Sequence, residues 1–485
     1  MSAPMSGDRG KKLIGMVVDP PTVEISEKYR YQQLLVTGVL ASGHTIDLTH
    51  QVRYELSDPI ASVSGGLVRA LSDGQASIQI VHEGEKIEIP VAITGQEVAF
   101  EPNFIRDINP IISKAGCNGG SCHGSKDGKN GFKLSLRGYD PLVDVRAFSD
   151  DHAGRRINFA SADDSLMLLK STGAVPHEGG QRFTVDSEYY QMLRDWIAAG
   201  CPLDQQVERV ARIEVMPKNP TIQRIGDTQQ LRITAFYDDG SKRDVTAEAF
   251  VSSGNIEVAR CNAAGLVSTE RRGEAPLLAR FEGAYAATTL TVMGDRSRFE
   301  WQEPEIFNPI DGFVADKWKR MKLQSSVLCT DAEFLRRVSL DLVGLPPTVE
   351  QVMGFLEDER ESKIKREALI DELIGSEGYV VHWGNRWADL LQVNGKYLGK
   401  EGASSFRQWI HEQVESNAPY DQFVHQILTA NGSNKENPPA SYFKILRTPA
   451  ETMENTTQLF LATRFNSNKC HDHPFERWTQ DQYYE

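Results

Sequence analysis

The chain has 485 residues, of which 40% are hydrophobic and 25% are charged. This composition is typical of a soluble globular protein, and the length indicates about three domains. With 53 lysines and arginines against 67 aspartates and glutamates, the net charge of −14 disfavours a nucleic-acid surface and favours a basic protein partner. The sequence has no run of about 18 apolar residues, so it predicts no transmembrane segment. Six cysteines in so long a chain argue against a disulfide scaffold.

Residues 1–20 are predicted to be an N-terminal tail, whose apolar stretch before Asp19 is too short for a signal-peptide core. Residues 21–97 read as strands, among them Leu34–Leu40 and Ile87–Ile93, separated by turns such as Asp73-Gly74. Short alternating strands between turn residues predict a small β-sandwich.

The same landmarks recur later in the chain. D-L-T at Asp47–Thr49 is matched by D-V-T at Asp244–Thr246, and G-L-V at Gly66–Val68 is matched by G-L-V at Gly265–Val267. Repeated landmarks of this kind indicate an internal repeat. Residues 206–295 are therefore predicted to form a second β-sandwich. Neither copy contains a convergent polar cluster, which favours a spacer role for both.

The segment between the repeats, residues 98–205, carries the most informative motif. Cys117 and Cys122 are followed directly by His123, and two thiols before a histidine form the pattern that attaches haem c, with the histidine as the iron ligand. The usual motif has two residues between the cysteines, whereas this chain has four. We expect haem c here, with Cys117 and Cys122 as its thioether attachments.

Two other interpretations of this motif stay open. The cysteines could form a local disulfide in an oxidising compartment, or His123 could belong to a metal site without haem. For the haem hypothesis, we expect Gly119 and Gly120 to adopt positive φ angles and to let the longer loop approach the ring.

A second iron ligand is expected from the loop before the closing helix of this segment. His177, in V-P-H-E-G-G, is the first candidate, and histidine in place of methionine would lower the reduction potential. Arg155 and Arg156 are candidates to pair with the haem propionates. An ordinary loop histidine is an equal interpretation of His177, and a solvated basic pair is the commoner meaning of Arg155 and Arg156. The remaining ligand candidates are Met167, Met192 and His152.

The helices around this motif are predicted by spacing. Pro110 opens a short helical turn before it, and Ser187 can cap a helix after it. Four apolar residues of the second helix fall on one face, and Gly200 ends it. These residues are Tyr189, Leu193, Trp196 and Ile197. A helix, a cysteine–histidine loop and a closing helix follow the plan of cytochrome c.

Longer motifs give a family resemblance. Gly131–Pro141, Gly154–Ile157, Ser165–Gly180 and Asp195–Gly200 resemble the planctomycete cytochrome-C-like domains. The two sandwiches resemble bacterial immunoglobulin-like domains. Residues 296–485 are similar to the helical companion domain of unknown function found in the same planctomycete proteins, which is also proposed to be cytochrome-like. The resemblance implies an extracytoplasmic protein that normally continues beyond this C-terminus.

The C-terminal segment holds a second cysteine–histidine motif. Cys470 and His471 would complete a haem attachment site with a cysteine at position 467, where relatives generally have one, but this chain has Ser467. His473 could join Cys470 and His471 at another metal such as zinc or iron, with Asp472 as ligand or supporting residue. A second haem, another metal ion and a purely structural turn all stay open.

The predicted fold is therefore multidomain, with two all-β immunoglobulin-like sandwiches alternating with a mostly α cytochrome-c-like domain and a C-terminal all-α domain. The leading functional hypothesis is a periplasmic or cell-surface electron-transfer protein with haem c and a redox partner protein. One alternative is a surface scaffold or adhesion protein without haem, with cell-surface components as partners. Another is a metal-dependent enzyme acting on an extracellular polymer through the C-terminal motif.

Overall fold

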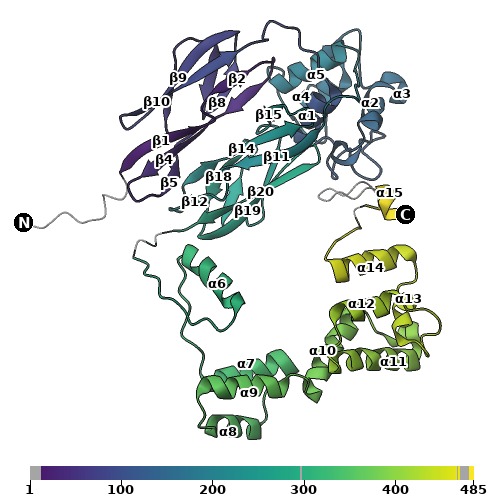
Figure 1. Cartoon of the computed structure of the whole chain (residues 1–485). Helices are drawn as coiled ribbons and strands as arrows, with labels where there is room; N and C mark the ends of the chain where they lie inside the picture. Colours follow the sequence, from purple (N-terminus) through teal and green to yellow (C-terminus); the bar gives the residue numbers. More distant parts are fainter. Residues whose placement is uncertain (1–11, 295, 297, 467, 470–479, 485) are drawn as a thin grey trace, which may run out of the picture. The chain divides into compact units, whose positions relative to one another are not determined.

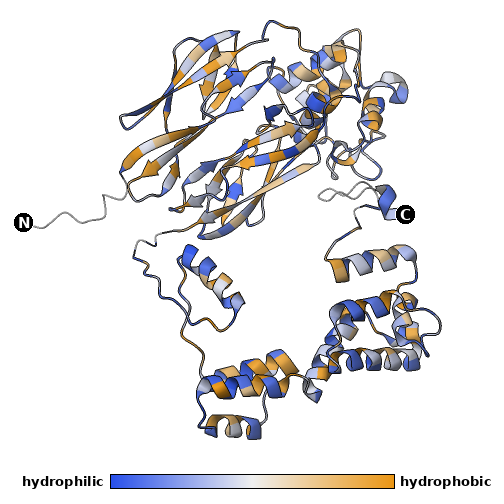
Figure 2. Ribbon diagram, in the orientation of Figure 1, coloured by the Kyte–Doolittle hydropathy of each residue, from blue (hydrophilic) through white to orange (hydrophobic). Residues whose placement is uncertain are grey.

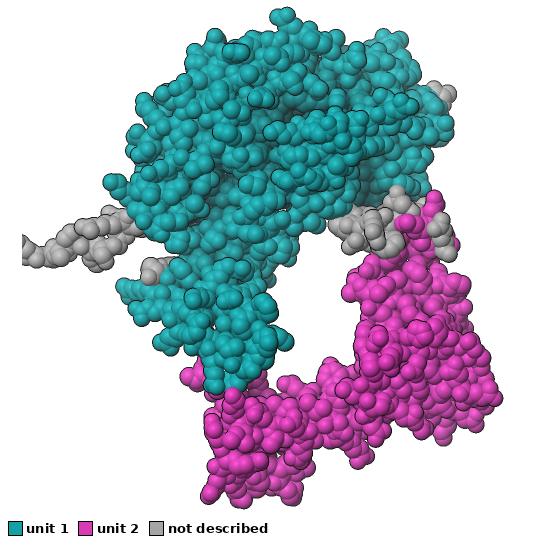
Figure 3. All heavy atoms as spheres, viewed as in Figure 1, with its two compact units in different colours: residues 1–323 teal, residues 324–485 magenta. Residues whose placement is uncertain are grey.

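The computed structural model describes the whole chain except residues 1–11, 295, 297, 467, 470–479 and 485. The chain divides into two compact units, residues 1–323 and residues 324–485 (Figures 1 and 3). Unit 1 contains the β-sheets and a helical insert, and unit 2 is helical. The expectation of β-sandwiches in the N-terminal half and helices in the C-terminal region is confirmed. Among the described residues, no helix is both long and apolar enough to cross a membrane.

The first sandwich begins at Leu13, inside the segment that the sequence predicts to be a tail. Three sheets have the strand orders β1-β4-β5, β2-β10-β9-β6 and β3-β8-β7. The strands are β1 (Leu13–Asp19), β2 (Val23–Ile25), β3 (Tyr31–Gln33), β4 (Leu35–Leu40), β5 (Thr45–Asp47), β6 (Arg53–Leu56), β7 (Ala61–Ser64), β8 (Leu67–Ala70), β9 (Gly74–His82) and β10 (Glu85–Ile93).

The second sandwich repeats the first strand for strand. Its sheets have the orders β11-β14-β15, β12-β20-β19-β16 and β13-β18-β17. The first strand of each copy even shifts register at its start, between Leu13 and Gly15 and between Val210 and Arg212. The strands are β11 (Val210–Met216), β12 (Thr221–Ile222), β13 (Thr228–Gln230), β14 (Arg232–Tyr237), β15 (Lys242–Asp244), β16 (Phe250–Ser253), β17 (Ala259–Cys261), β18 (Leu266–Thr269), β19 (Gly273–Phe281) and β20 (Ala284–Val292).

Alternation of apolar and polar residues explains why these segments form strands. In β10, Ile89, Val91 and Ile93 are buried in the core, whereas Glu88 and Pro90 between them are exposed. Successive side chains of a strand point to opposite faces, so this order places every second residue inside the sandwich. Figure 2 shows the resulting mixture of apolar and polar residues along the strands.

The two sandwiches contact one another through a reciprocal pair of hydrogen bonds, which we call the reciprocal contact. The backbone N–H of Gln33 donates to Asp244 Oδ2 at 2.6 Å, and the backbone N–H of Gln230 donates to Asp47 Oδ2, also at 2.6 Å. In each copy the other carboxylate oxygen accepts the backbone N–H and the hydroxyl of the threonine two residues later. The repeated D-L-T and D-V-T motifs therefore form a self-complementary interface, like that of a two-fold dimer.

The insert between the sandwiches is helical and has its own core. A π-helical turn, Phe104–Ile108, leads into α1 (Asn109–Lys114), and α5 (Glu188–Ala198) closes the insert. Ser187 caps α5, and Leu193, Trp196 and Ile197 on its inner face are buried. The helices between them are α2 (Pro141–Ser149), α3 (Asp151–Gly154) and α4 (Leu166–Thr172).

A buried ion triad joins the insert to both sandwiches. The side chain of Asp107 is fully buried and lies 3.0 Å from the Arg30 guanidinium and 3.3 Å from that of Arg243. Arg30 belongs to the first sandwich and Arg243 to β15 of the second. One carboxylate therefore pairs with a cation from each neighbour, and Arg30 also pairs with Glu27 at 2.7 Å. We call Arg30, Asp107 and Arg243 the Asp107 triad.

Further contacts hold the insert in the same place. Lys114, the last residue of α1, donates from Nζ to the carbonyl oxygens of Ala249 at 2.6 Å and Ala263 at 2.8 Å in the second sandwich. Tyr29 of the first sandwich donates to Asp195 of α5 at 3.1 Å. Because Lys114 comes directly before the cysteine–histidine loop, these bonds fix the helix from which that loop starts.

The remaining helices follow the second sandwich. α6 (Pro309–Arg320) belongs to unit 1, where its Lys317 pairs with Glu274 of β19 at 2.7 Å. In unit 2, α7 ends at Val343 because Gly344 adopts a left-handed conformation with φ 73°. The helices of unit 2 are α7 (Asp331–Val343), α8 (Val349–Glu357), α9 (Ser362–Leu373), α10 (Glu377–Leu390), α11 (Gly395–Glu415), α12 (Tyr420–Leu428), α13 (Ser441–Ile445), α14 (Pro449–Leu461) and α15 (Gln480–Tyr484).

Candidate functional site

The cysteine–histidine loop is a compact coil at the end of α1. The backbone N–H of Cys117 donates to Ile112 O at 3.0 Å, and that of His123 donates to Cys117 O at 2.9 Å. The expectation of positive φ at Gly119 and Gly120 is wrong, because these residues form an ordinary turn closed by the N–H of Cys122 on Gly119 O. The glycine at positive φ is instead Gly116, with φ 80°.

The two thiols of the loop are free and are not bonded to each other. Burial raises the pKa of Cys117 to about 11. This thiol is therefore protonated at neutral pH and is not a reactive thiolate. The local disulfide considered from the sequence is absent from the structure.

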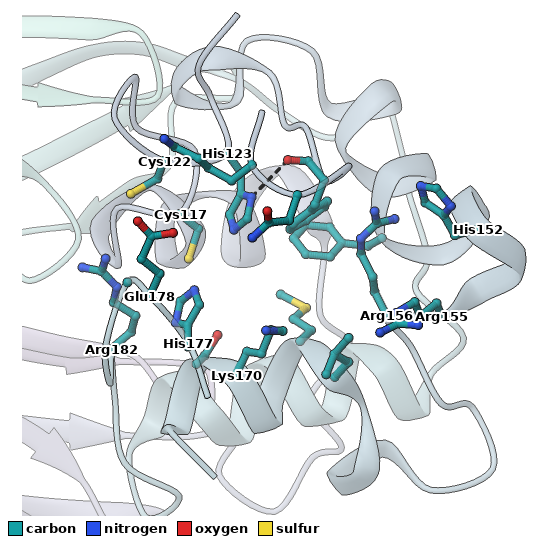
Figure 4. Close-up of a pocket in the computed structure, with 18 of the residues that line it drawn as sticks. Cys117, Cys122, His123, His152, Arg155, Arg156, Lys170, His177, Glu178 and Arg182 are labelled. Carbon is teal, nitrogen blue, oxygen red and sulfur yellow. Dashed lines mark hydrogen bonds between the residues drawn. The ribbon is translucent and has the colours of Figure 1, made fainter. Parts of the chain in front are cut away.

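His123 is held with one ring nitrogen engaged. Its Nδ1 lies 3.0 Å from the carbonyl oxygen of Phe132, so Nδ1 carries the proton and donates it, and the Nε2 lone pair is left for a ligand (Figure 4). The Phe132 ring packs against the imidazole with centroids 4.4 Å apart. Burial lowers the pKa of His123, which keeps the imidazole neutral and able to coordinate a metal.

His177 lies across the cavity from His123 in Figure 4. It belongs to the loop after α4, and its Nδ1 lies 2.9 Å from Gly180 O, so the same reasoning leaves its Nε2 available. A Cβ atom on Gly179 would come within 2.8 Å of the His177 ring, so a larger residue here would displace that ring. Both histidines therefore have the second-sphere hydrogen bond that metal-ligating histidines commonly have.

Between these residues is a cavity of about 590 Å³. This volume is within the range of about 300–1,000 Å³ of small-molecule and cofactor sites. Apolar side chains form part of the wall, and cationic ones another part. The residues used below are Cys117, Cys122, His123, Lys129, Phe132, Phe148, His152, Arg155, Arg156, Met167, Lys170, His177, Glu178 and Arg182.

The structure places the other predicted residues in different environments. Met167 and His152 line the cavity, whereas Met192 is buried in the core of the insert. Arg155 is exposed at the cavity. Arg156 is buried, donates to Ala147 O at 2.7 Å and to Gly131 O at 2.9 Å, and stacks on Phe132, so its guanidinium is already engaged.

Sequence reasoning missed three cations of this wall, Lys129, Lys170 and Arg182. Lys170 follows Met167 by three residues on α4, so helical spacing could have placed both on one face. Lys129 and Arg182 lie in loops, where no periodic signal exists.

The metal site without haem that the sequence allows at His123 stays a prediction. In the described part of the chain, no group of three or more histidine, cysteine, aspartate or glutamate side chains is arranged to hold one ion. The sulfur and imidazole groups instead surround a space larger than an ion. The C-terminal candidates Ser467, Cys470, His471, Asp472 and His473 lie outside the described residues, and the metal and enzyme hypotheses based on them stay predictions.

Comparison with known proteins gives partial matches. Residues 309–485 match the family described as "PSCyt2: Protein of unknown function (DUF1549)", as expected for the helical C-terminal region. A curated relative, "Ice-binding protein 1" of Shewanella frigidimarina, is 24% identical over 266 residues, covering 54% of this chain and 27% of that protein. This chain thus spans about a quarter of the relative's length.

Solved structures give only distant similarity. The S-layer protein SbsC domains 5–6 align with 59% of this chain at 11% identity and a TM-score of 0.24, over 99% of that chain. A structure of SbsC domains 4–9 aligns with 58% at 11% identity and the same TM-score, over 31% of that chain. Similarities at this level carry no argument about fold or function. The similarity of residues 309–485 to the DUF1549 family is what the comparisons support.

Proposed function

We propose that this chain is an extracellular or cell-surface scaffold, in which two β-sandwiches hold a helical module in a fixed position. The observation that carries the proposal is that each of the three modules of unit 1 is bonded to the other two. The reciprocal contact joins the sandwiches, and the Asp107 triad joins both of them to the insert. A flexible string of domains would not bury so many polar contacts between its modules.

The curated relative supports the same proposal. A bacterial protein named for binding ice must reach ice, which lies outside the cell, and its alignment with this chain covers 266 residues. We extend the location and the architecture to this chain, and not ice binding, since only 27% of the relative is matched.

The location can be tested on cells that produce the native protein. We expect a protease added to intact cells to remove the protein, while a cytoplasmic marker enzyme stays intact. Recovery of the whole protein with that marker, inside protease-resistant cells, would contradict the proposal.

A second candidate function, binding of haem c, is favoured by one specific observation. Two free thiols and two imidazoles with available Nε2 atoms surround a cavity of about 590 Å³ with aromatic walls. These groups fit haem c. Support for haem comes from this cavity, and none of it comes from the comparisons.

In this proposal each residue has a defined role. Cys117 and Cys122 would hold the porphyrin by thioether bonds. His123 and His177 would hold the iron, each oriented by its Nδ1–H bond to a backbone carbonyl. Bound haem would supply one-electron transfer. Arg155 is better placed than Arg156 to meet a propionate, because the Arg156 guanidinium already donates to two carbonyls.

Expression in a host that matures haem c tests this candidate. We expect a red protein whose Soret band survives extraction with acidic acetone and is lost in the Cys117→Ala/Cys122→Ala double variant. Cys329→Ala, which changes a cysteine of unit 2, is the matched control and should keep the haem. His177→Ala should shift the visible spectrum, whereas His152→Ala should not.

A colourless wild-type protein with the same thermal stability as the double variant would remove the haem candidate. The scaffold proposal would survive that result, because it does not depend on what the cavity contains.

A further inference from the structure

The cavity wall has the opposite charge to the protein as a whole. The chain carries a net charge of −14. Residues 98–205 contain 12 lysines and arginines and 14 aspartates and glutamates, yet five of the cations and only one of the acids, Glu178, line the cavity. This segregation concentrates positive charge at one place on an acidic protein.

Three of these cations are available to an external partner. Lys129, Arg155 and Arg182 are exposed, and no ion pair within the described residues engages any of them. Figure 4 shows Arg155 and Arg182 at opposite ends of the cavity. Arg156 and Lys170 are less available, because Arg156 is buried and Lys170 donates to Pro176 O at 3.0 Å.

We propose that the mouth of this cavity is the docking surface for the acidic face of a partner protein. The available cations are spread across both ends of the mouth, which fits a surface carrying several negative charges better than one small anion. Complementary charge of this kind raises the rate and specificity of association. Weak encounters between redox proteins use small interfaces, for which a charged rim suffices.

An acidic partner differs from the basic partner that the net charge of −14 favours. Charge at the docking site decides encounter geometry, because charges farther away than about 8–10 Å are screened at physiological salt. The proposal rests on the cavity being the functional site of the insert, as the haem candidate does, but it does not require haem. A colourless protein can be tested in the same way, so failure of one proposal is distinguishable from failure of the other.

The test uses the full chain and a fluorescein-labelled polyglutamate peptide, with binding followed by fluorescence anisotropy at increasing salt. We expect binding at low salt that weakens as salt rises. The triple variant Lys129→Glu/Arg155→Glu/Arg182→Glu should bind at least about tenfold more weakly. The control triple Arg53→Glu/Lys86→Glu/Arg224→Glu changes the net charge equally at exposed positions of the sandwiches and should stay within about twofold of wild type.

Absence of polyglutamate binding at low salt, or equal losses in both triple variants, would overturn the proposal. Two further probes identify other anions. Heparin that binds the same residues more tightly than polyglutamate would assign the surface to an anionic polysaccharide and overturn the protein assignment. Inorganic phosphate that displaces the peptide at matched ionic strength would assign a small-anion site, with the same consequence. Equal thermal unfolding of all three proteins confirms that the variants are folded.

Discussion

The two sandwiches of unit 1 have the same strand order and the same reciprocal contact, yet they hold the insert in different ways. The first contributes the side chains of Tyr29 and Arg30. The second contributes Arg243 and also two backbone carbonyls that accept from Lys114. Residues that repeat between the copies form the reciprocal contact, and unlike pairs such as Tyr31–Glu248 and Arg232–Asp19 add further bonds between the copies. The residues that join the insert do not repeat.

This difference shows how two similar sandwiches can bind a single insert that does not share their symmetry. A self-complementary contact closes on itself and uses the same residues from both partners. Because one insert binds both copies, its contacts come from positions at which the sequences of the copies have diverged. The following experiments test that division, from the largest expected effect to the smallest.

Removal of Asp107 should have the largest effect, because the guanidinium of Arg243 would lose the carboxylate with which it pairs, while Arg30 would keep its pair with Glu27. We expect Asp107→Ala to lower the free energy of unfolding by about 3–5 kcal/mol. Chemical denaturation monitored by tryptophan fluorescence measures this, since Trp196 lies in the insert core. The exposed Asp58→Ala is the control and should change stability by less than about 0.5 kcal/mol. A loss below about 1 kcal/mol for Asp107→Ala would mean that the triad does not hold the modules together.

The two aspartates of the reciprocal contact should make the free energy of unfolding depend on pH. Asp244 should contribute more to this dependence than Asp47. Burial raises the pKa of Asp244 to about 6 from an ordinary value of 3.8, and it also raises that of Asp47. The folded state therefore holds the Asp244 proton more tightly than the unfolded state. The resulting stabilisation is complete below about pH 4 and is lost as the pH rises through about 6. At about 1.4 kcal/mol per pKa unit, it amounts to about 3 kcal/mol.

Denaturation of wild type, Asp244→Asn and Asp47→Asn across this pH window measures the contribution of each aspartate. Comparison with wild type removes the contribution of other carboxylates. We expect Asp244→Asn to flatten the pH profile more than Asp47→Asn does. Identical profiles for the two variants would show that the copies are equivalent at this contact.

The matched glycines of the repeat should differ by the smallest amount. Gly66 and Gly265 both have φ 78°, so alanine at either position costs roughly 1–2 kcal/mol for a left-handed conformation. At Gly66 a Cβ would also come within 2.7 Å of Leu34 O, whereas at Gly265 the corresponding distance to Leu231 O is 3.4 Å. We therefore expect Gly66→Ala to be more destabilising than Gly265→Ala, by about 1 kcal/mol in thermal or chemical denaturation. Equal losses would indicate that the first sandwich relaxes around the added methyl group.

Local sequence patterns predict the parts of the fold that depend on interactions between neighbouring residues, such as helix ends. Ser187 caps α5 as predicted, because a serine oxygen can accept a backbone N–H wherever a helix starts. Gly344 ends α7 because its left-handed conformation is available to glycine in any context. The missed strand β1 shows the limit of this approach, since Gly15 and a register shift interrupt its alternation.

The candidate site was predicted from sequence to a similar extent. The chemistry of their side chains predicts Cys117, Cys122, His123 and His177 as site residues, and all four line one cavity. That Met192 is packed in the core and that Arg156 is occupied by two carbonyls depends on contacts with residues distant in sequence. Helical spacing or charge alone does not determine such contacts.

The sequence by itself determined the repeat, the helix and strand types, and the chemical groups of the candidate site, since each follows from neighbouring residues or from residue type. Only the tertiary structure decided how Asp47 and Asp244 pair across the repeats and how Asp107 joins three modules. It also decided that positive charge gathers around the cavity of an acidic protein. These features depend on which buried polar groups meet after folding. A buried polar group must form a hydrogen bond or ion pair, but the residues next to it in sequence do not identify its partner.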